Sequence, residues 1–217
     1  ETATEEKRMK RLLALALCAA MCLTGAACAE TVGKTGMYNE NSILRCVAPN
    51  GQELYYLGQW VAERVEPRLE DVNFDGMDDV VVMTARGATN GWEQYFVWNG
   101  ESYEHAAWNW GCDTGLPNAV LHADGKLLET CETDGWAGLL HRKAIYRWEG
   151  TELVMIRCAV SEETEDGQGV RLRVYEAEYG EGERADRVVW ERSATLDECS
   201  DGTVLDEENA ALWDGLK

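Results

Sequence analysis

The sequence predicts a mainly β protein in which an antiparallel meander forms a blade-like sheet, a sandwich or an incomplete propeller, with a short C-terminal helix. The first supporting observation is a series of short runs rich in β-branched and aromatic residues from Ile43 onward. The second is a set of turn dipeptides that separate these runs, namely Asn50-Gly51, Asn99-Gly100, Asp124-Gly125 and Glu149-Gly150. The third is the scarcity of helical periodicity.

Each expected strand is a β-rich run that ends at turn residues. We expect strands at residues 43–47, 53–57, 80–84, 93–98, 103–107, 119–122, 127–131, 141–148, 152–159, 170–175 and 187–192. One or two helical turns are expected at residues 60–66. A terminal helix is expected at residues 206–216, with Asp206 as its N-cap and with Ala211, Leu212 and Leu216 along its apolar side.

A faint internal repeat relates residues 95–103 to residues 145–153, an offset of 50 residues from Trp98 to Trp148. Each copy consists of an aromatic strand, a tight glycine turn and a return strand. Hairpins of this kind can converge on similar sequences, and a four-stranded blade unit can also be duplicated. The residues leave both explanations open.

The first 29 residues are typical of an export signal. A basic segment at Met9 to Arg11 precedes an apolar stretch, and small residues around Cys28 end just before Glu30. Uncleaved anchoring in a bilayer and lipidation of Cys28 are alternatives, and apart from this segment we expect no membrane association. The predicted location is therefore secreted, periplasmic or at the cell envelope. The chain divides into an upstream extension (1–8), a signal peptide (9–29) and a single β domain (30–217).

Composition excludes one class of function. The 217 residues include 40 Asp and Glu against 20 Lys and Arg, a formal net charge of -20. Nucleic-acid binding needs clustered basic residues, so it is not expected. The domain after residue 29 has five cysteines without a CxxC pair, which makes a structural zinc site improbable and allows at most two disulfides of unknown pairing. They are Cys46, Cys112, Cys131, Cys158 and Cys199.

Residues 71–79 carry the most informative motif, a D-x-N-x-D-G-x-x-D loop that leads directly into a β-rich run. Oxygen ligands at alternate positions of a tight loop point to a common centre, and a hard cation takes six to eight of them. The predicted metal is Ca²⁺. Its expected ligands are side-chain oxygens of Asp71, Asn73 and Asp75, the backbone carbonyl of Met77, and a carboxylate of Asp79 directly or through water. Position 12 of the loop is Val82 rather than Glu, so the motif is not an EF-hand.

This loop and the strand after it resemble the calcium loops of FG-GAP/VCBS-type β-propeller repeats. The wider stretch from Pro67 through Asn99 is similar to a group of small exported bacterial proteins with one such loop on a blade-like sheet. That group includes periplasmic inhibitors of lysozyme. The resemblance implies a calcium-stabilised binding domain that covers roughly residues 43–159, although no inhibitory loop carries over residue by residue.

Two further sets of residues are weaker candidates. Trp108 and Trp110 share one face if the segment is extended, so with Trp136 they form a possible ligand-binding set that would stack on sugar rings. Packing in the core is the more common fate of such residues. Glu132, Asp134 and His141 surround a glycine-kinked connection and are the candidates for a hydrolase, but no complete catalytic set is present and we expect no enzyme.

These observations lead to one main hypothesis and two alternatives. The main hypothesis is an exported, calcium-stabilised domain without catalytic activity that binds a macromolecule at the cell envelope. A cationic enzyme such as lysozyme is a candidate protein partner, because an acidic surface attracts basic proteins. A carbohydrate-binding module is the first alternative, and a hydrolase is the second.

Overall fold

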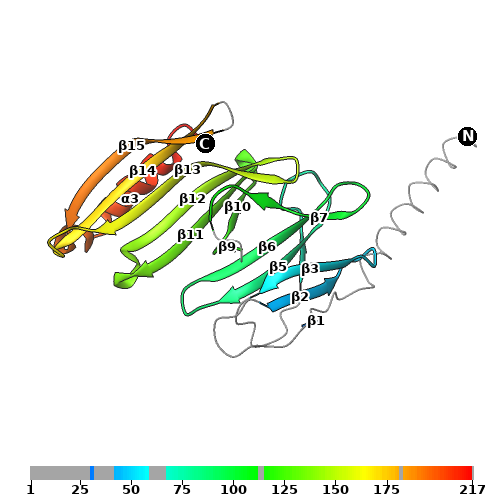
Figure 1. The fold of residues 1–217 in the computed structure, drawn as a ribbon. Helices are drawn as coiled ribbons and strands as arrows, with labels where there is room; N and C mark the ends of the chain where they lie inside the picture. Colours follow the sequence, from blue (N-terminus) through cyan, green and yellow to red (C-terminus); the bar gives the residue numbers. More distant parts are fainter. Residues whose placement is uncertain (1–29, 32–41, 59–66, 112–114, 181–182, 217) are drawn as a thin grey trace, which may run out of the picture.

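The computed structural model describes residues 30–31, 42–58, 67–111, 115–180 and 183–216. Within them the protein is mainly β, with antiparallel sheets, a short C-terminal helix and no closed barrel (Figure 1), which confirms the predicted fold class. The expected signal peptide, the helical turns at residues 60–66, Cys28 and Cys112 lie outside the described residues.

Three sheets contain the described strands. The first has the order β1-β2-β3 and consists of Glu30–Thr31, Ser42–Val47 and Glu53–Gly58. The second has the order β4-β5-β6-β7, with β9 also paired to β6, and consists of Arg68–Glu70, Asp79–Arg86, Gly91–Trp98, Tyr103–His105 and Leu116–Pro117. The third runs from β10 to β15 and consists of Val120–His122, Leu127–Gly135, Leu140–Glu149, Glu152–Glu163, Gly169–Gly180 and Glu183–Thr195. Strand β8, Ala107–Trp108, pairs with β13 in parallel, an exception to the antiparallel pattern.

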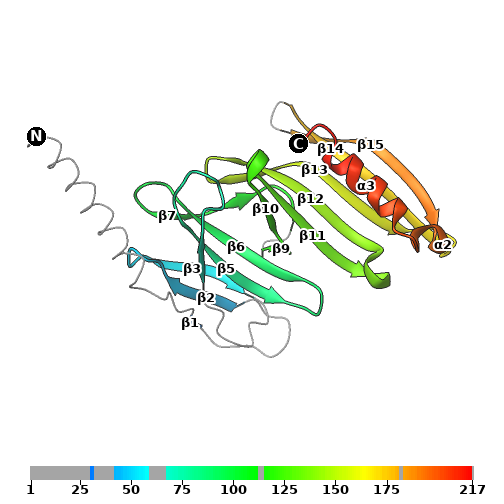
Figure 2. The ribbon, with the colours of Figure 1, turned by 180° about the vertical axis from the view of Figure 1, so that it is seen from behind.

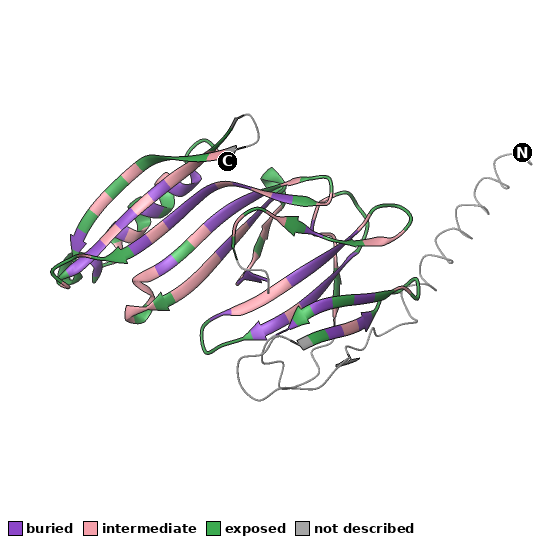
Figure 3. Cartoon of the chain, viewed as in Figure 1, coloured by how far each residue is buried: buried purple, intermediate pink, exposed green. Residues whose placement is uncertain are grey.

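The second sheet is buried on both faces. Alternate residues of a strand point to opposite faces. Val80 and Val82 pack against the first sheet, whereas Val81 packs into the core shared with the third sheet. This explains why β5 is a continuous apolar run instead of an alternating one. Figure 3 shows buried residues along the strands of the second sheet and also along strands of the two sheets on either side of it.

A helix covers the face of the third sheet that points away from the second sheet. Helix α3, Thr203–Trp213, packs across β13, β14 and β15 (Figure 2), and Leu212 is fully buried there with Ile145 and Val174. A short helix α2, Leu196–Cys199, precedes it. The protein is therefore a stack of three sheets and one helical layer.

The expected terminal helix exists, but its predicted boundaries are wrong. It begins at Thr203 with Gly202 as N-cap, so Asp206 lies in the first turn and is not the cap. Val204 is buried against the sheet, and this packing draws the preceding residues into the helix. The helix ends at Trp213, before Leu216.

All the expected strands are present, and most are longer than predicted. The expected strand at 103–107 is divided: β7 ends at His105, the backbone N–H of Ala106 still donates to the Tyr95 carbonyl, and β8 then pairs with β13 of the third sheet. The repeated hairpins are the β6–β7 pair in the second sheet and the β12–β13 pair in the third.

Candidate functional site

The loop between β4 and β5 holds the motif expected to bind calcium, and its polar side chains turn back onto the loop. Asp71 accepts hydrogen bonds from the backbone N–H groups of Asp75 and Gly76, at 3.0 and 2.9 Å. Asn73 Oδ1 accepts from the Asp75 N–H, and Asn73 Nδ2 donates to Asp75 Oδ2 at 2.9 Å. Gly76 has a φ of 91°, which the tight turn requires. The structure thus gathers Asp71, Asn73 and Asp75 at one turn.

Asp79 lies beneath this loop and has a different role. Its side chain is fully buried, and its two oxygens accept the backbone N–H groups of Val72 at 3.0 Å and Trp98 at 2.8 Å. Burial raises the pKa of Asp79 to about 6, although these backbone hydrogen bonds act in the opposite direction. Asp79 therefore ties the start of the loop to the end of β6. Met77 is exposed on the loop surface.

The donor chemistry of the loop fits a hard cation. Each carboxylate oxygen has two lone pairs, so an oxygen that accepts a backbone N–H still has one available for a metal. Among the described residues, no three His, Cys, Asp or Glu side chains are grouped as a metal site, and this finding includes Asp71, Asp75 and Asp79. The expected ligand set also uses the Asn73 side chain and the Met77 backbone carbonyl. Lys126 Nζ also donates to the Phe74 carbonyl at 2.9 Å and so places a positive charge beside the loop. Calcium binding remains a prediction on the ligand set Asp71, Asn73, Asp75, Met77 and Asp79.

A hollow of about 790 Å³ adjoins this loop. Its walls come from the loop itself, from the two repeated hairpin tips and from Lys126, which follows the short 3₁₀ helix η1, Ala123–Gly125. The aromatic members are Trp98 and Trp148, which occupy equivalent positions of the repeat. The remaining lining residues are Asn73, Asp75, Met77, Val97, Asn99, Gly100, Gly150 and Thr151. Both copies of the 50-residue repeat thus contribute their hairpin tips to the lining of one hollow.

The tryptophans proposed to contact ligand do not form a strand platform. Trp108 is in β8 but Trp110 lies beyond its end, and both are partly buried against the core between the second and third sheets. Trp136 is partly buried on the other side of the third sheet, in a 3₁₀ turn where its φ is 48°. In the structure these tryptophans pack against the hydrophobic core. Their binding of a ligand stays a prediction.

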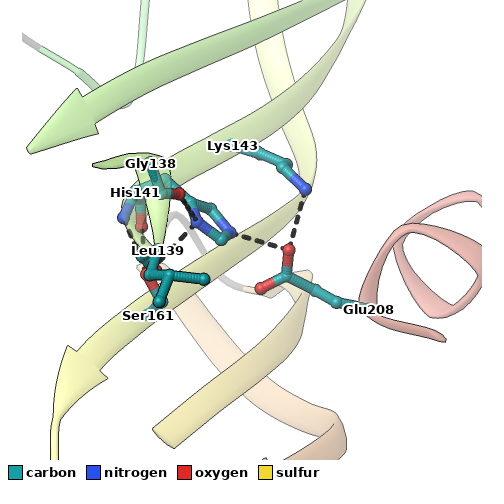
Figure 4. Close-up of polar contacts among 6 residues, drawn as sticks. All are labelled: Gly138, Leu139, His141, Lys143, Ser161 and Glu208. Atoms are coloured by element: carbon teal, nitrogen blue, oxygen red, sulfur yellow. Dashed lines mark hydrogen bonds and ion pairs between the residues drawn. The ribbon is translucent and has the colours of Figure 1, made fainter. Parts of the chain in front are cut away.

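The structure separates His141 from the acidic residues considered with it. Glu132 is half-buried, and burial raises its pKa. Asp134 forms an exposed ion pair with Arg142, in which Asp134 Oδ2 lies 3.5 Å from Arg142 Nε. His141 instead points beneath α3, where its Nε2 lies 2.7 Å from Glu208 Oε2 (Figure 4). Glu132, Asp134 and His141 are therefore not joined by a hydrogen bond or ion pair in the structure.

A buried polar cluster links the third sheet to helix α3. Glu208 is fully buried, and the same Oε2 accepts a hydrogen bond from Lys143 Nζ at 2.8 Å. His141 Nδ1 lies 3.1 Å from the Gly138 carbonyl oxygen, so both ring nitrogens lie within hydrogen-bond distance of an oxygen atom. Burial alone would raise the pKa of Glu208, but His141 and Lys143 together hold it below its usual value of 4.5.

Ser161 completes this cluster without forming a nucleophile–base pair. Its Oγ donates to the Leu139 carbonyl at 2.7 Å and accepts the backbone N–H of His141 at 2.7 Å. The contact between Ser161 Oγ and His141 Nδ1 is 3.4 Å, and both side chains are buried. Since the hydroxyl proton is committed to a carbonyl, this geometry suits helix anchoring better than nucleophilic attack. Sequence reasoning missed Glu208 because no local signal connects it to a residue 67 positions earlier.

The described cysteines are free thiols. Cys46 and Cys158 are buried, and burial raises the pKa of each to about 11. Burial also raises the pKa of Cys131 and Cys199. No disulfide joins these four described residues.

Comparisons with known proteins give little beyond this geometry. No protein-family model matches the chain, and no curated protein matches it. A solved structure of a Xanthomonas type IV secretion system related protein is similar to it at 14% sequence identity, with a TM-score of 0.45, over 73% of this chain and 87% of that one. A likeness this distant carries no information about function. In the described part of the chain, no helix combines the length and apolarity needed to span a membrane.

Proposed function

We propose that this protein is an exported, calcium-stabilised binding domain without catalytic activity that recognises a macromolecule at the cell envelope. The observation that carries the proposal is the loop between β4 and β5, where hydrogen bonds gather Asp71, Asn73 and Asp75 at one turn. The resemblance of this loop to FG-GAP/VCBS calcium loops supports the same conclusion. The export-like segment at residues 9–29 supports the location.

In this proposal, bound calcium would stabilise the folded protein. The loop residues would hold the ion and supply oxygen ligands, and the ion would fix the turn between β4 and β5. Asp79 already joins this turn to β6 through buried hydrogen bonds, so a fixed turn also fixes one wall of the adjoining hollow.

The first experiment is thermal unfolding of the purified protein with calcium and with a chelator. A ligand that binds only the folded state stabilises it by about 2.7 kcal/mol at 100 times its Kd. We expect calcium to raise the Tm of the wild type and to leave Asp75→Ala unchanged. Asp166→Ala is the matched control. Asp166 accepts the backbone N–H of Gln168 in an exposed turn, as Asp75 accepts the backbone N–H of Met77 in the loop. Equal Tm values with calcium and chelator in the wild type would reject the calcium site.

The second experiment tests the partner. The net charge of -20 favours association with basic proteins, and a cationic lysozyme is a suitable probe. We expect salt-sensitive binding and reduced lysozyme activity in the presence of the protein. Absence of both effects at low ionic strength would reject lysozyme as the partner.

A further inference from the structure

We propose that the hollow beside the acidic loop binds a neutral saccharide, with Trp98 and Trp148 as the stacking side chains. This inference rests on the proposed binding function and assigns a ligand class to it. It differs from the sequence-based platform of Trp108 and Trp110, because neither of those residues lines the hollow.

The size and the walls of the hollow suit a small organic ligand. Pockets that bind such ligands commonly have volumes of about 300–1,000 Å³, and this hollow has about 790 Å³. Three separate regions of the chain build it: the β4–β5 loop, the β6–β7 tip and the β12–β13 tip, with Lys126 from a fourth. The hairpin tips extend from sheets that share one packed core, so the two tryptophans stand on rigid elements.

The aromatic side chains point to a sugar ring. A pyranose has an apolar face of C–H groups and a rim of hydroxyls, and an indole offers a large flat surface to that face. Trp98 and Trp148 are each only partly buried, so each retains exposed surface. The Nε1 of Trp148 is buried, and the ring packs edge-on against Tyr95 of the shared core, so a sugar would contact only the exposed part of this indole.

Two polar groups on the walls can pair with sugar hydroxyls. Lys126 has three N–H donors, and the described contacts show one acceptor, the Phe74 carbonyl. The Thr151 hydroxyl has no hydrogen bond among the described residues and can both donate and accept. In contrast, the side chain of Asn99 is occupied by its own turn, where it bonds the backbone of Glu101 and Ser102.

Charge selects a neutral saccharide over an anionic one. Asp75 lines the hollow as Lys126 does, so one negative and one positive side chain offset each other and the hollow is not a cationic pocket. The chain as a whole has a net charge of -20, which repels polyanions. A glycan without carboxylate, sulfate or phosphate groups is repelled neither by Asp75 nor by the net negative charge of the chain.

The test is a titration of the purified protein with three neutral probes, cellohexaose, maltohexaose and chitohexaose, followed by intrinsic tryptophan fluorescence and by calorimetry. We expect at least one probe to bind, and we expect Trp98→Ala and Trp148→Ala each to lower the association constant about tenfold. Thr151→Val is expected to weaken binding and Thr151→Ser to restore it. Trp190→Ala, in β15 and outside the lining of the hollow, is the matched control and is expected to bind as the wild type does, whereas Trp110→Ala tests the alternative platform.

The outcomes separate this inference from the proposed function. No binding of any probe at millimolar concentration would overturn the inference, as would unchanged binding by Trp98→Ala and Trp148→Ala or loss of binding only in Trp110→Ala. Circular dichroism of each variant checks the fold, and the two Thr151 variants decide the matter if a tryptophan variant fails to fold. A calcium-dependent Tm shift without saccharide binding would overturn only the inference. Saccharide binding without a calcium effect would overturn the calcium part of the proposed function.

Discussion

Replacement of Glu208 by Gln is expected to destabilise the protein, because Glu208 is a fully buried carboxylate that bonds two basic side chains, the buried His141 and the partly buried Lys143. Glu208 Oε2 accepts from Lys143 Nζ at 2.8 Å and lies 2.7 Å from His141 Nε2, and its side chain is fully buried. The amide has nearly the same shape but no charge. The variant would therefore leave the positive charge of Lys143 uncompensated in a poorly solvated place.

The magnitude follows from the burial of the partners. Removing one member of a buried ion pair costs about 3–5 kcal/mol. The side chain of Lys143 is 16% exposed, so water compensates part of the loss, and we take the lower limit of about 3 kcal/mol. For a domain of this length, each kcal/mol lowers Tm by about 2–4 °C, which predicts a decrease of about 6–12 °C.

The assay is thermal and urea unfolding at pH 7, with Glu178→Gln as the control. Glu178 pairs with Arg187, but both side chains are more than half exposed, so solvent screens the pair and we expect no measurable change in Tm. A Glu208→Gln variant with a Tm within about 2 °C of the wild type would refute the buried-charge reasoning.

The pH dependence of unfolding gives a second check on Glu208. Its pKa is lower in the folded protein than its usual 4.5, so its contribution to stability is present above that value and is lost as pH falls through the folded pKa. The wild type should therefore lose stability more steeply than Glu208→Gln below about pH 4.5. Parallel stability curves for the two proteins in that range would contradict this account.

Three other predictions test separate parts of the structure. Asp79→Ala leaves two backbone N–H groups without their acceptor, and we expect a loss of about 1–3 kcal/mol for each of them in urea unfolding; a neutral effect would show that water replaces the carboxylate. Leu212→Ala should cost about 2–5 kcal/mol because it opens a cavity under α3, whereas Leu196→Ala, at a residue 44% exposed, should change stability by less than about 0.5 kcal/mol. Cys46 and Cys158, with pKa values of about 11, should resist alkylation by iodoacetamide in the folded protein and react after unfolding, as measured by mass spectrometry; rapid labelling of either under native conditions would contradict their burial.

Local sequence signals predicted the strands because each hairpin contains its own information, but they did not predict the division into three sheets or the parallel pairing of β8 with β13. Alternating or continuous apolar residues and glycine turns specify where a strand begins and ends. The start of α3 could not be read in this way. Val204 is held in the helix by its burial against β14 and β15, a contact between residues far apart in the chain, while the local signal favoured Asp206 as the cap.

In the candidate sites, too, contacts between residues far apart in the chain could not be predicted from local sequence signals. The acidic loop is contiguous, so its gathered side chains were foreseen from spacing alone. The anchoring of His141 depends on Glu208, which belongs to another layer, and its neighbours in sequence suggested a different set of partners. The alternation of Trp108 and Trp110 predicts a strand platform, but the ladder of β8 ends at Trp108.

The internal repeat is the one long-range signal that the sequence did contain. Because the second and third sheets pack face to face, hairpins that share a pattern place equivalent residues on facing surfaces. Trp98 and Trp148 then line one hollow although neither contributes a motif of its own. Convergence and duplication both remain compatible with that arrangement, since either produces the same two tips. The proposed stacking of a sugar on Trp98 and Trp148 requires that both hairpin tips keep their glycine turns and their aromatic residues. Loss of either tryptophan would remove one wall of the hollow while the hairpin ladder that supports it stays intact.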